Sequence, residues 1–242
     1  MISDLIYKAN KEKNKLWAVL IDPSVISNEL LDKYIKAMKQ TPPSIILVGG
    51  SLLLNNADNI IKNIKAQIPS PIVLFPGHTT QISKYADAIL FLSLISGRNP
   101  EYLIGQQVIA APLLKETNME IIPTGYILID GGKTTSVEYI SNTRPIPAGK
   151  TDIAKATALA GQYIGHKLIY LEAGSGANHH ITTKMVKEVA EYIDIPLIVG
   201  GGITSTEEAK TLYQAGATCL VIGSYFEQNP EKIVEFAKNI DK

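Results

Sequence analysis

Short apolar runs recur along the whole chain, and polar, helix-forming stretches separate most of them. Eight runs rich in Val, Ile and Leu lack polar alternation, which is typical of parallel strands covered on both faces. They span residues 16–22, 44–50, 71–77, 87–93, 120–130, 167–174, 195–201 and 218–224. Apolar side chains recur at helical spacing in residues 28–40, 152–163, 182–192, 204–215 and 230–240.

This order of elements predicts the fold class. Strands that alternate with helices form parallel βαβ units, and eight units predict a closed (β/α)8 barrel in one α/β domain of residues 1–242. A doubly wound open sheet is the alternative. Between Gly77 and Asp87 there is room only for a short helix or an irregular crossing. The long polar stretch 131–151 is expected to form a loop over the active-site face.

Composition narrows the class of protein without choosing a function. The 242 residues suffice for one large core, and 23 basic residues balance 23 acidic ones, so overall charge does not indicate a nucleic-acid partner. The single Cys219 excludes an internal disulfide and is expected to be a small buried apolar residue. No stretch reaches the roughly 20 apolar residues of a membrane span, and no signal peptide is evident, so we expect a cytoplasmic protein.

Two glycine turns near the C-terminus predict a phosphate site. Residues 195–203 read IPLIVGGGI and residues 217–224 read ATCLVIGS, and each turn follows an expected strand. Glycine allows a backbone N–H to approach a ligand oxygen closely, and a helix N-terminus adds unpaired N–H groups. In a barrel, the loops after strands 7 and 8 are a frequent phosphate site. The chain is therefore expected to bind a phosphorylated small molecule.

Polar side chains at the ends of the first two strands suggest a metal site. Asp22 ends the run LID and precedes a proline, so its carboxylate is suited to a hard cation such as Mg2+, or else caps the next turn. Ser51 follows the turn VGG, and its hydroxyl either joins a metal shell or caps a helix. The residues alone leave both pairs of alternatives open.

The sixth expected strand ends in YLEAGSGA, residues 170–177. If Leu171 packs against the outer helices, Tyr170 and Glu172 face the barrel mouth, because side chains alternate along a strand. A carboxylate at that position is a candidate general base, and the following GSG run adds backbone donors. A purely structural carboxylate would be an unusual choice there.

Several other kinds of site are not indicated. The histidines at 78, 166, 179 and 180 do not show zinc-ligand spacing. A G-x-S-x-G elbow, a Walker loop and a G-x-G-x-x-G fingerprint are all missing from the sequence.

The motifs LIDP, VGGS, LFPG, YLEAGSGA, VGGGI and VIGS, in this order, resemble the geranylgeranylglyceryl phosphate synthase family, which includes bacterial heptaprenylglyceryl phosphate synthases. The resemblance covers nearly the whole chain, and YLEAGSGA is its most specific part. It implies a modified TIM barrel whose third helix is replaced. It also implies a Mg2+-dependent prenyltransferase that joins sn-glycerol 1-phosphate to a polyprenyl diphosphate.

The resemblance also assigns residues. It implies that Asp22 and Ser51 bind Mg2+, and Glu172 is the residue we expect to act as the catalytic base. It places glycerol phosphate on the segment after strand 6 and on the two glycine turns: Tyr170, Leu171, Glu172, Ala173, Gly174, Ser175, Gly176, Gly200, Gly201, Gly223 and Ser224. Gly77 and His78 either face the diphosphate or form a simple turn.

Two features bear on the branch of the family. Shorter bacterial members carry a lysine two residues before the metal aspartate, where this chain has Leu20. The segment SGRNPEYLIGQ, residues 96–106, resembles the larger branch found in archaea and some bacteria, which is often hexameric. We therefore expect a homo-oligomer, either a dimer or a hexamer, with geranylgeranyl diphosphate as the donor. Because the donor is a lipid, peripheral membrane contact is compatible with the sequence.

The sequence therefore predicts an alkyl (prenyl) transferase of lipid biosynthesis that uses Mg2+. The alternatives are a phosphosugar isomerase or aldolase of the same fold, a flavin-binding barrel enzyme, and a phosphate-ligand sensor or carrier without catalytic activity. An aldolase would need a strand-end lysine, whereas Lys167 begins its expected strand.

Overall fold

The apolar runs form eight parallel strands that close into a barrel. The computed structural model describes residues 1–51 and 57–240. Neighbouring strands pair in sequence order, and β1 closes the barrel against β8, which excludes the open doubly wound sheet. The strands are β1 (Leu16–Ile21), β2 (Ile45–Val48), β3 (Ile72–Leu74), β4 (Ala88–Leu94), β5 (Glu120–Leu128), β6 (Leu168–Glu172), β7 (Leu197–Gly200) and β8 (Cys219–Ile222).

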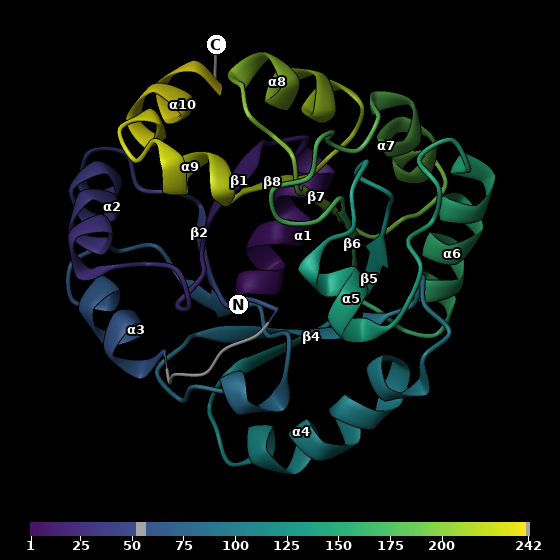
Figure 1. Cartoon of the computed structure of the whole chain (residues 1–242), viewed down its shortest axis with the longest axis horizontal. Coiled ribbons are helices and arrows are strands. Elements are labelled where there is room, and N and C mark those ends of the chain that lie inside the picture. The colour runs from purple at the N-terminus through teal and green to yellow at the C-terminus, as the bar shows by residue number, and fades with distance from the viewer. Residues whose placement is uncertain (52–56, 241–242) are drawn as a thin grey trace.

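Most of the helices form an outer ring around the barrel, whereas α1 and α5 lie inside that ring in the view of Figure 1. Their amphipathic patterns place apolar side chains against the strands and charged ones outward. The helices are α1 (Ile2–Glu12), α2 (Asn28–Gln40), α3 (Asp58–Lys65), α4 (Gln106–Lys115), α5 (Ser136–Ser141), α6 (Thr151–Tyr163), α7 (Thr183–Ala190), α8 (Thr206–Gln214), α9 (Ser224–Gln228) and α10 (Lys232–Ile240). A π-helical turn, η2 (Glu101–Gly105), leads into α4.

The strands are buried on both faces, which explains their lack of alternation in the sequence. Alternate side chains belong to two clusters, one inside the barrel and one between the barrel and the helices. In β6, Tyr170 belongs to the inner cluster, whereas Leu171 belongs to the outer one. Cys219 is also buried in the inner cluster, as expected.

The third connection departs from the barrel repeat, as the sequence predicted. Between β3 and β4 there is only the 3-10 turn η1 (Thr79–Gln81). The Gln81 side chain fixes this crossing to the strand ends, because its amide accepts from Gly77 N–H at 3.0 Å and donates to the Gly50 carbonyl at 2.8 Å. The crossing itself lines that side of the barrel mouth, with residues such as Gly77, His78 and Ile82.

Helix α1, which the sequence reading did not predict, covers the amino-terminal end of the barrel. In Figure 1 it is seen through the barrel, behind the strands. Ile6 and Ala9 belong to the inner cluster. The Glu120 carboxylate, at the start of β5, accepts from the Ile2 and Ser3 amides at the helix N-terminus. One end of the barrel is thus closed, and the other is left for ligands.

The stretch 131–151 lies over the open end, as expected. It is not wholly irregular, because it contains the short helix α5, which is capped by the Thr135 hydroxyl. An isolated bridge pairs Ile129 with Ile146 and holds the far end of the stretch beside β5.

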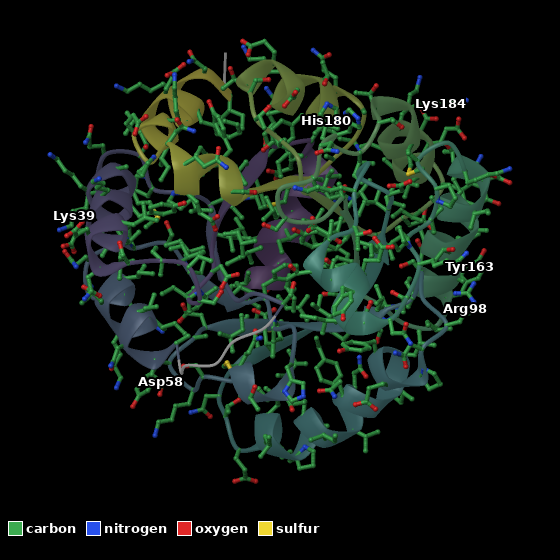
Figure 2. All side chains as sticks on the ribbon, viewed as in Figure 1. Lys39, Asp58, Arg98, Tyr163, His180 and Lys184 are labelled. Atoms are coloured by element: carbon green, nitrogen blue, oxygen red, sulfur yellow. The ribbon has the colours of Figure 1, made fainter. Side chains whose placement is uncertain are left out.

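Charged side chains project outward from the helical ring, as Lys39 and Lys184 do in Figure 2. In residues 1–51 and 57–240, no helix has the length and apolarity required to cross a membrane.

Candidate active site

One large cavity of about 330 Å³ opens at the carboxyl ends of the strands. Every strand of the barrel contributes to it, directly or through the loop that follows. This is the end at which barrel enzymes carry their chemistry. The cavity has a polar part near β1, β2 and β6–β8, and an apolar part near β4, α4 and α5.

Glu172 lies at the inner end of the polar part. Its side chain is only 5% exposed, and its Oε1 accepts a hydrogen bond of 2.6 Å from Gly174 N–H. Burial raises the pKa of this carboxyl to about 7, although the Gly174 amide and the neighbouring Tyr170 hydroxyl act in the opposite direction. A pKa raised towards neutrality suits a general base.

Gly200, the last residue of β7, and Gly201, which follows it, make room for this carboxylate. A Cβ at Gly200 would collide with the Tyr170 hydroxyl, and one at Gly201 would collide with Glu172 Oε1. Gly201 also has a φ of 84°, which favours glycine. The Tyr170 hydroxyl has no hydrogen bond of standard geometry within the described residues, although Glu172 lies beside it. These glycines therefore determine how closely β7 packs against the candidate base.

The two glycine turns that were predicted to form a phosphate cup both lie at the cavity. Gly201, Gly202, Gly223 and Ser224 all line the cavity. The cup is joined to the segment after β6, because Gly176 N–H donates to the Ser224 hydroxyl oxygen at 3.1 Å.

The start of helix α8 offers fewer free backbone donors than the sequence suggested. The Glu208 carboxylate accepts from the Thr204 and Ser205 amides in a capping box, so these two donors are already used. The start of α8 is thus a weaker phosphate site than the sequence suggested, and the cup depends mainly on the glycine backbone.

Not every residue assigned by the resemblance reaches the cavity. Leu171 and Ala173 pack in the outer cluster, so their side chains face the helices. Alternation along β6 turns these two side chains away from the cavity, so the predicted contact of this segment with glycerol phosphate would involve their backbone. Tyr170, Glu172, Gly174, Ser175 and Gly176 all line the cavity. Gly200 contributes by making room for Tyr170 and Glu172.

Asp22 and Ser51 both line the opposite side of the polar part. Asp22 Oδ1 accepts from the Ser24 amide at 2.8 Å and from its hydroxyl at 2.7 Å, so the turn-capping interpretation is confirmed. The carboxylate nevertheless lies in the cavity, packed so closely on Gly50 that a Cβ there would collide with it. Ser51 does not cap α3, whose N-cap is Ala57. Gly77 and His78 also line the cavity.

Glu227 is a site residue that sequence reasoning missed. It lies on α9, three residues after Ser224, and lines the cavity. Burial raises the pKa of its carboxyl, and the negative charge of Asp22 raises it further, which shows that the two side chains are electrostatically coupled. Its position shortly after the eighth apolar run, where barrel enzymes carry site residues, could have indicated it from the sequence.

The apolar part provides room for a hydrocarbon. Its walls come from β4, from η2 and α4, and from α5, with Leu92, Ala110 and Ile140 as examples. Where it meets the polar part, Phe75 stacks on Tyr170 with ring centres 5.2 Å apart, and Tyr126 lies 5.4 Å from Tyr170. The sequence did not locate this channel.

In the described part of the chain, no group of three or more His, Cys, Asp or Glu side chains could hold a metal ion. A cation in the polar part would therefore use few protein ligands. Asp22 and the Ser51 hydroxyl are oxygen donors, and Mg2+ typically combines one or two such ligands with substrate phosphates. The side chains present fit that mode of binding.

Comparisons with known proteins agree with this geometry. A family model described as the PcrB family matches residues 7–240. The chain belongs to the PcrB family. The family resemblance that the motifs suggested is confirmed.

Individual members of the PcrB family are similar over nearly their full lengths. A curated relative from Flavobacterium johnsoniae, named geranylgeranylglyceryl phosphate synthase, is 48% identical over 229 residues, which cover 94% of each chain. One of the same name from Pyrococcus horikoshii is 44% identical over 90% of this chain and 85% of its own.

A solved structure shows the same barrel. The (S)-3-O-geranylgeranylglyceryl phosphate synthase of Thermoplasma acidophilum, in complex with its substrate sn-glycerol-1-phosphate, superposes with a TM-score of 0.89. It is 34% identical, and the match covers 98% of this chain and 96% of that one.

Proposed function

We propose that this PcrB-family protein joins sn-glycerol 1-phosphate to a polyprenyl diphosphate, with geranylgeranyl diphosphate as the expected donor. The observation that carries the proposal is the buried Glu172 carboxylate between a glycine-lined cup and an apolar channel in one cavity. Relatives named geranylgeranylglyceryl phosphate synthase support the donor and the product. The T. acidophilum complex supports the acceptor.

Glu172 accepts the proton of the attacking alcohol. A glycerol hydroxyl oxygen forms the new ether bond to the allylic carbon, the bond from that carbon to the diphosphate oxygen breaks, and diphosphate leaves with the electron pair. The hydroxyl proton moves to Glu172, whose pKa of about 7 suits this task near neutral pH. The cup holds the phosphate so that the hydroxyl faces the donor, and such orientation can save roughly 7–11 kcal/mol of the barrel enzyme's activation barrier.

Asp22 and Ser51 hold the diphosphate side. Their oxygens line the cavity beside Gly50, where the close contact with Asp22 leaves space only for a glycine. When bound there, Mg2+ would neutralise the charge that develops on the leaving diphosphate. The negative charge of Asp22 raises the pKa of Glu227, which adds a second carboxylate to this side of the cavity.

The side chains that line the cavity disfavour a Schiff-base aldolase. Among the described residues, no lysine lines the cavity, so a Schiff-base aldolase would have no nucleophile there. A flavin enzyme would be yellow when purified. A sensor would bind glycerol phosphate without turnover, which the assay below distinguishes.

The reaction is tested by incubating the protein with sn-glycerol 1-phosphate, Mg2+ and prenyl diphosphates of several lengths, with products identified by mass spectrometry. We expect a prenylglyceryl phosphate ether. Glu172→Gln keeps the size of the side chain but cannot accept the proton, so turnover should fall at least about a hundredfold while glycerol phosphate still binds. Glu191→Gln, on the exposed outer surface, is the matched control. Wild-type turnover in Glu172→Gln would exclude this assignment.

Asp22→Asn tests the metal side. The amide keeps the hydrogen-bonding oxygen for Ser24 but loses the charge that attracts a cation, so half-maximal activity should need at least about tenfold more Mg2+. The measurement is initial rate against Mg2+ concentration at saturating substrates. Asp32→Asn, exposed on α2, is the control. An unchanged Mg2+ titration in Asp22→Asn would argue against its role as a ligand.

The assembly and location follow the same proposal. A cytoplasmic homo-oligomer, either a dimer or a hexamer, would take its lipid donor during brief contact with a membrane. The apolar side chains exposed on α4, such as Val108 at 64%, support an additional protein contact.

A further inference from the structure

The charge of the cavity does not match the charge of its proposed ligands. Among the described residues that line it, the charged ones apart from the His78 imidazole are three carboxylates: Asp22, Glu172 and Glu227. Both proposed substrates are anions. On the diphosphate side a divalent cation would compensate, but on the glycerol phosphate side the lining offers only backbone amides and hydroxyls. A cation close to the cup would remove this imbalance.

Lys133 supplies a positive charge at that place. A Cβ built on Gly176 would lie 3.4 Å from the Lys133 Nζ, and no other atom outside the adjacent residues would lie within 4 Å. Gly176 is the residue whose amide donates to Ser224 in the cup. The ammonium group therefore lies beside the junction between the segment after β6 and the turn after β8, although Lys133 comes from the loop after β5.

Hydrogen bonds hold the two residues that precede Lys133, Gly131 and Gly132, against the segment after β6. The Gly131 carbonyl accepts from the amides of Asn178 and His179, at 2.9 and 3.2 Å. The Gly132 carbonyl accepts from the Asn178 side chain at 3.0 Å. The segment after β6 and the lysine loop are thus held together by three hydrogen bonds.

The residues after Lys133 are fixed as well. Thr135 is buried, and its side chain packs against Gly174 so closely that a Cβ there would collide with it. The Thr135 hydroxyl also accepts from the Glu138 amide and caps α5. With both sides anchored, the Lys133 backbone has a set place at the cup, while its long side chain keeps the freedom to reach a ligand.

We infer that Lys133, which lies beside the cup next to Gly176 and not in the cavity lining, reaches the phosphate of the acceptor and binds it. The inference rests on the proposed function, because it takes glycerol phosphate as the ligand of the cup. A lysine ammonium is a compact point charge with three donors, well suited to a phosphate oxygen that protrudes from a backbone nest. Lys133 would therefore determine preference for a phosphorylated acceptor over an uncharged alcohol.

The test removes the positive charge of Lys133 and retains an apolar side chain of similar length. In Lys133→Met, the KM for sn-glycerol 1-phosphate should rise at least about tenfold, whereas kcat and the KM for the prenyl diphosphate should change less than about threefold. Lys133→Arg should recover most of the affinity, because charge rather than shape is the main requirement. Lys184→Met is the matched control, since Lys184 on α7 is 78% exposed and points away from the barrel (Figure 2).

Binding measured without the donor separates this inference from the proposed reaction. Calorimetric titration of the intact protein with sn-glycerol 1-phosphate should show the same loss in Lys133→Met, and weaker salt dependence than in the wild type. If the wild type binds it but makes no ether with any donor, the proposed function fails while the role of Lys133 stands. Equal affinity of Lys133→Met and the wild type would overturn the inference. A loss shared equally by Lys184→Met would also overturn it.

Discussion

At the scale of single residues, the buried carboxyl of Glu172 lowers the stability of the folded protein when it is ionised. The carboxyl has an ordinary pKa of 4.5, and burial beside β7 raises the pKa to about 7. Because the folded state binds the proton more tightly than the unfolded chain, the stabilisation from protonation is complete below pH 4.5. It is lost as the pH rises through 7. Above pH 7 the ionised carboxylate costs roughly 3 kcal/mol of folding free energy, since each pKa unit corresponds to about 1.4 kcal/mol.

This predicts that Glu172→Gln, in which turnover is expected to fall, is more stable than the wild type at alkaline pH. Urea denaturation at pH 8 should show a gain of up to about 3 kcal/mol, and the gain should shrink towards zero near pH 5. The amide oxygen can still accept from Gly174 N–H, so the substitution removes charge and retains this contact. A gain of the same size at both pH values would show that ionisation of Glu172 is not its cause.

At the scale of elements, local patterns predicted the strands better than the helices. All eight apolar runs form strands, because burial on both faces leaves an unbroken signal. The prediction of α2 matched at both ends, since Ser27 caps it and its apolar stripe is regular. Helix α4 was missed because it is apolar on nearly all sides and contains Pro112, so no helical period stands out. Helix α1 was also not predicted, and the Glu120 carboxylate that accepts from its first two amides lies more than a hundred residues away in the sequence.

The residues of the candidate site also divide into those that local sequence patterns predicted and those that they did not. Asp22, Ser51 and Glu172 were predicted because the ends of parallel strands must meet at one end of a barrel. Glu227 was not predicted, because the motif assignment ended at Ser224 and no helix was expected directly after it. Lys133 lies in the stretch 131–151, which was expected over the active-site face but from which no residue was assigned. Leu171 and Ala173 were assigned as part of a contiguous motif, and alternation along β6 turns their side chains towards the helices.

At the scale of the whole molecule, the outer side of η2 and α4 exposes a group of large apolar side chains. Ile104, Val108, Ile109 and Leu113, here called the α4 apolar surface, are each more than half exposed. The inner side of the same helix carries Gln107, whose amide donates to the Tyr102 carbonyl and lines the cavity. A second copy of the chain on the α4 apolar surface would therefore stabilise one wall of the apolar channel.

The last prediction tests that arrangement. Val108→Asp places a charge in the middle of the α4 apolar surface, and a buried unpaired charge opposes association. We expect light scattering to show a smaller assembly than for the wild type, together with a raised KM for the prenyl diphosphate. Tyr163→Asp, at a residue 76% exposed on α6, is the control for charge on another apolar position. If Tyr163→Asp dissociates the assembly and Val108→Asp leaves it intact, the contact between copies lies on α6 and the α4 apolar surface has another role.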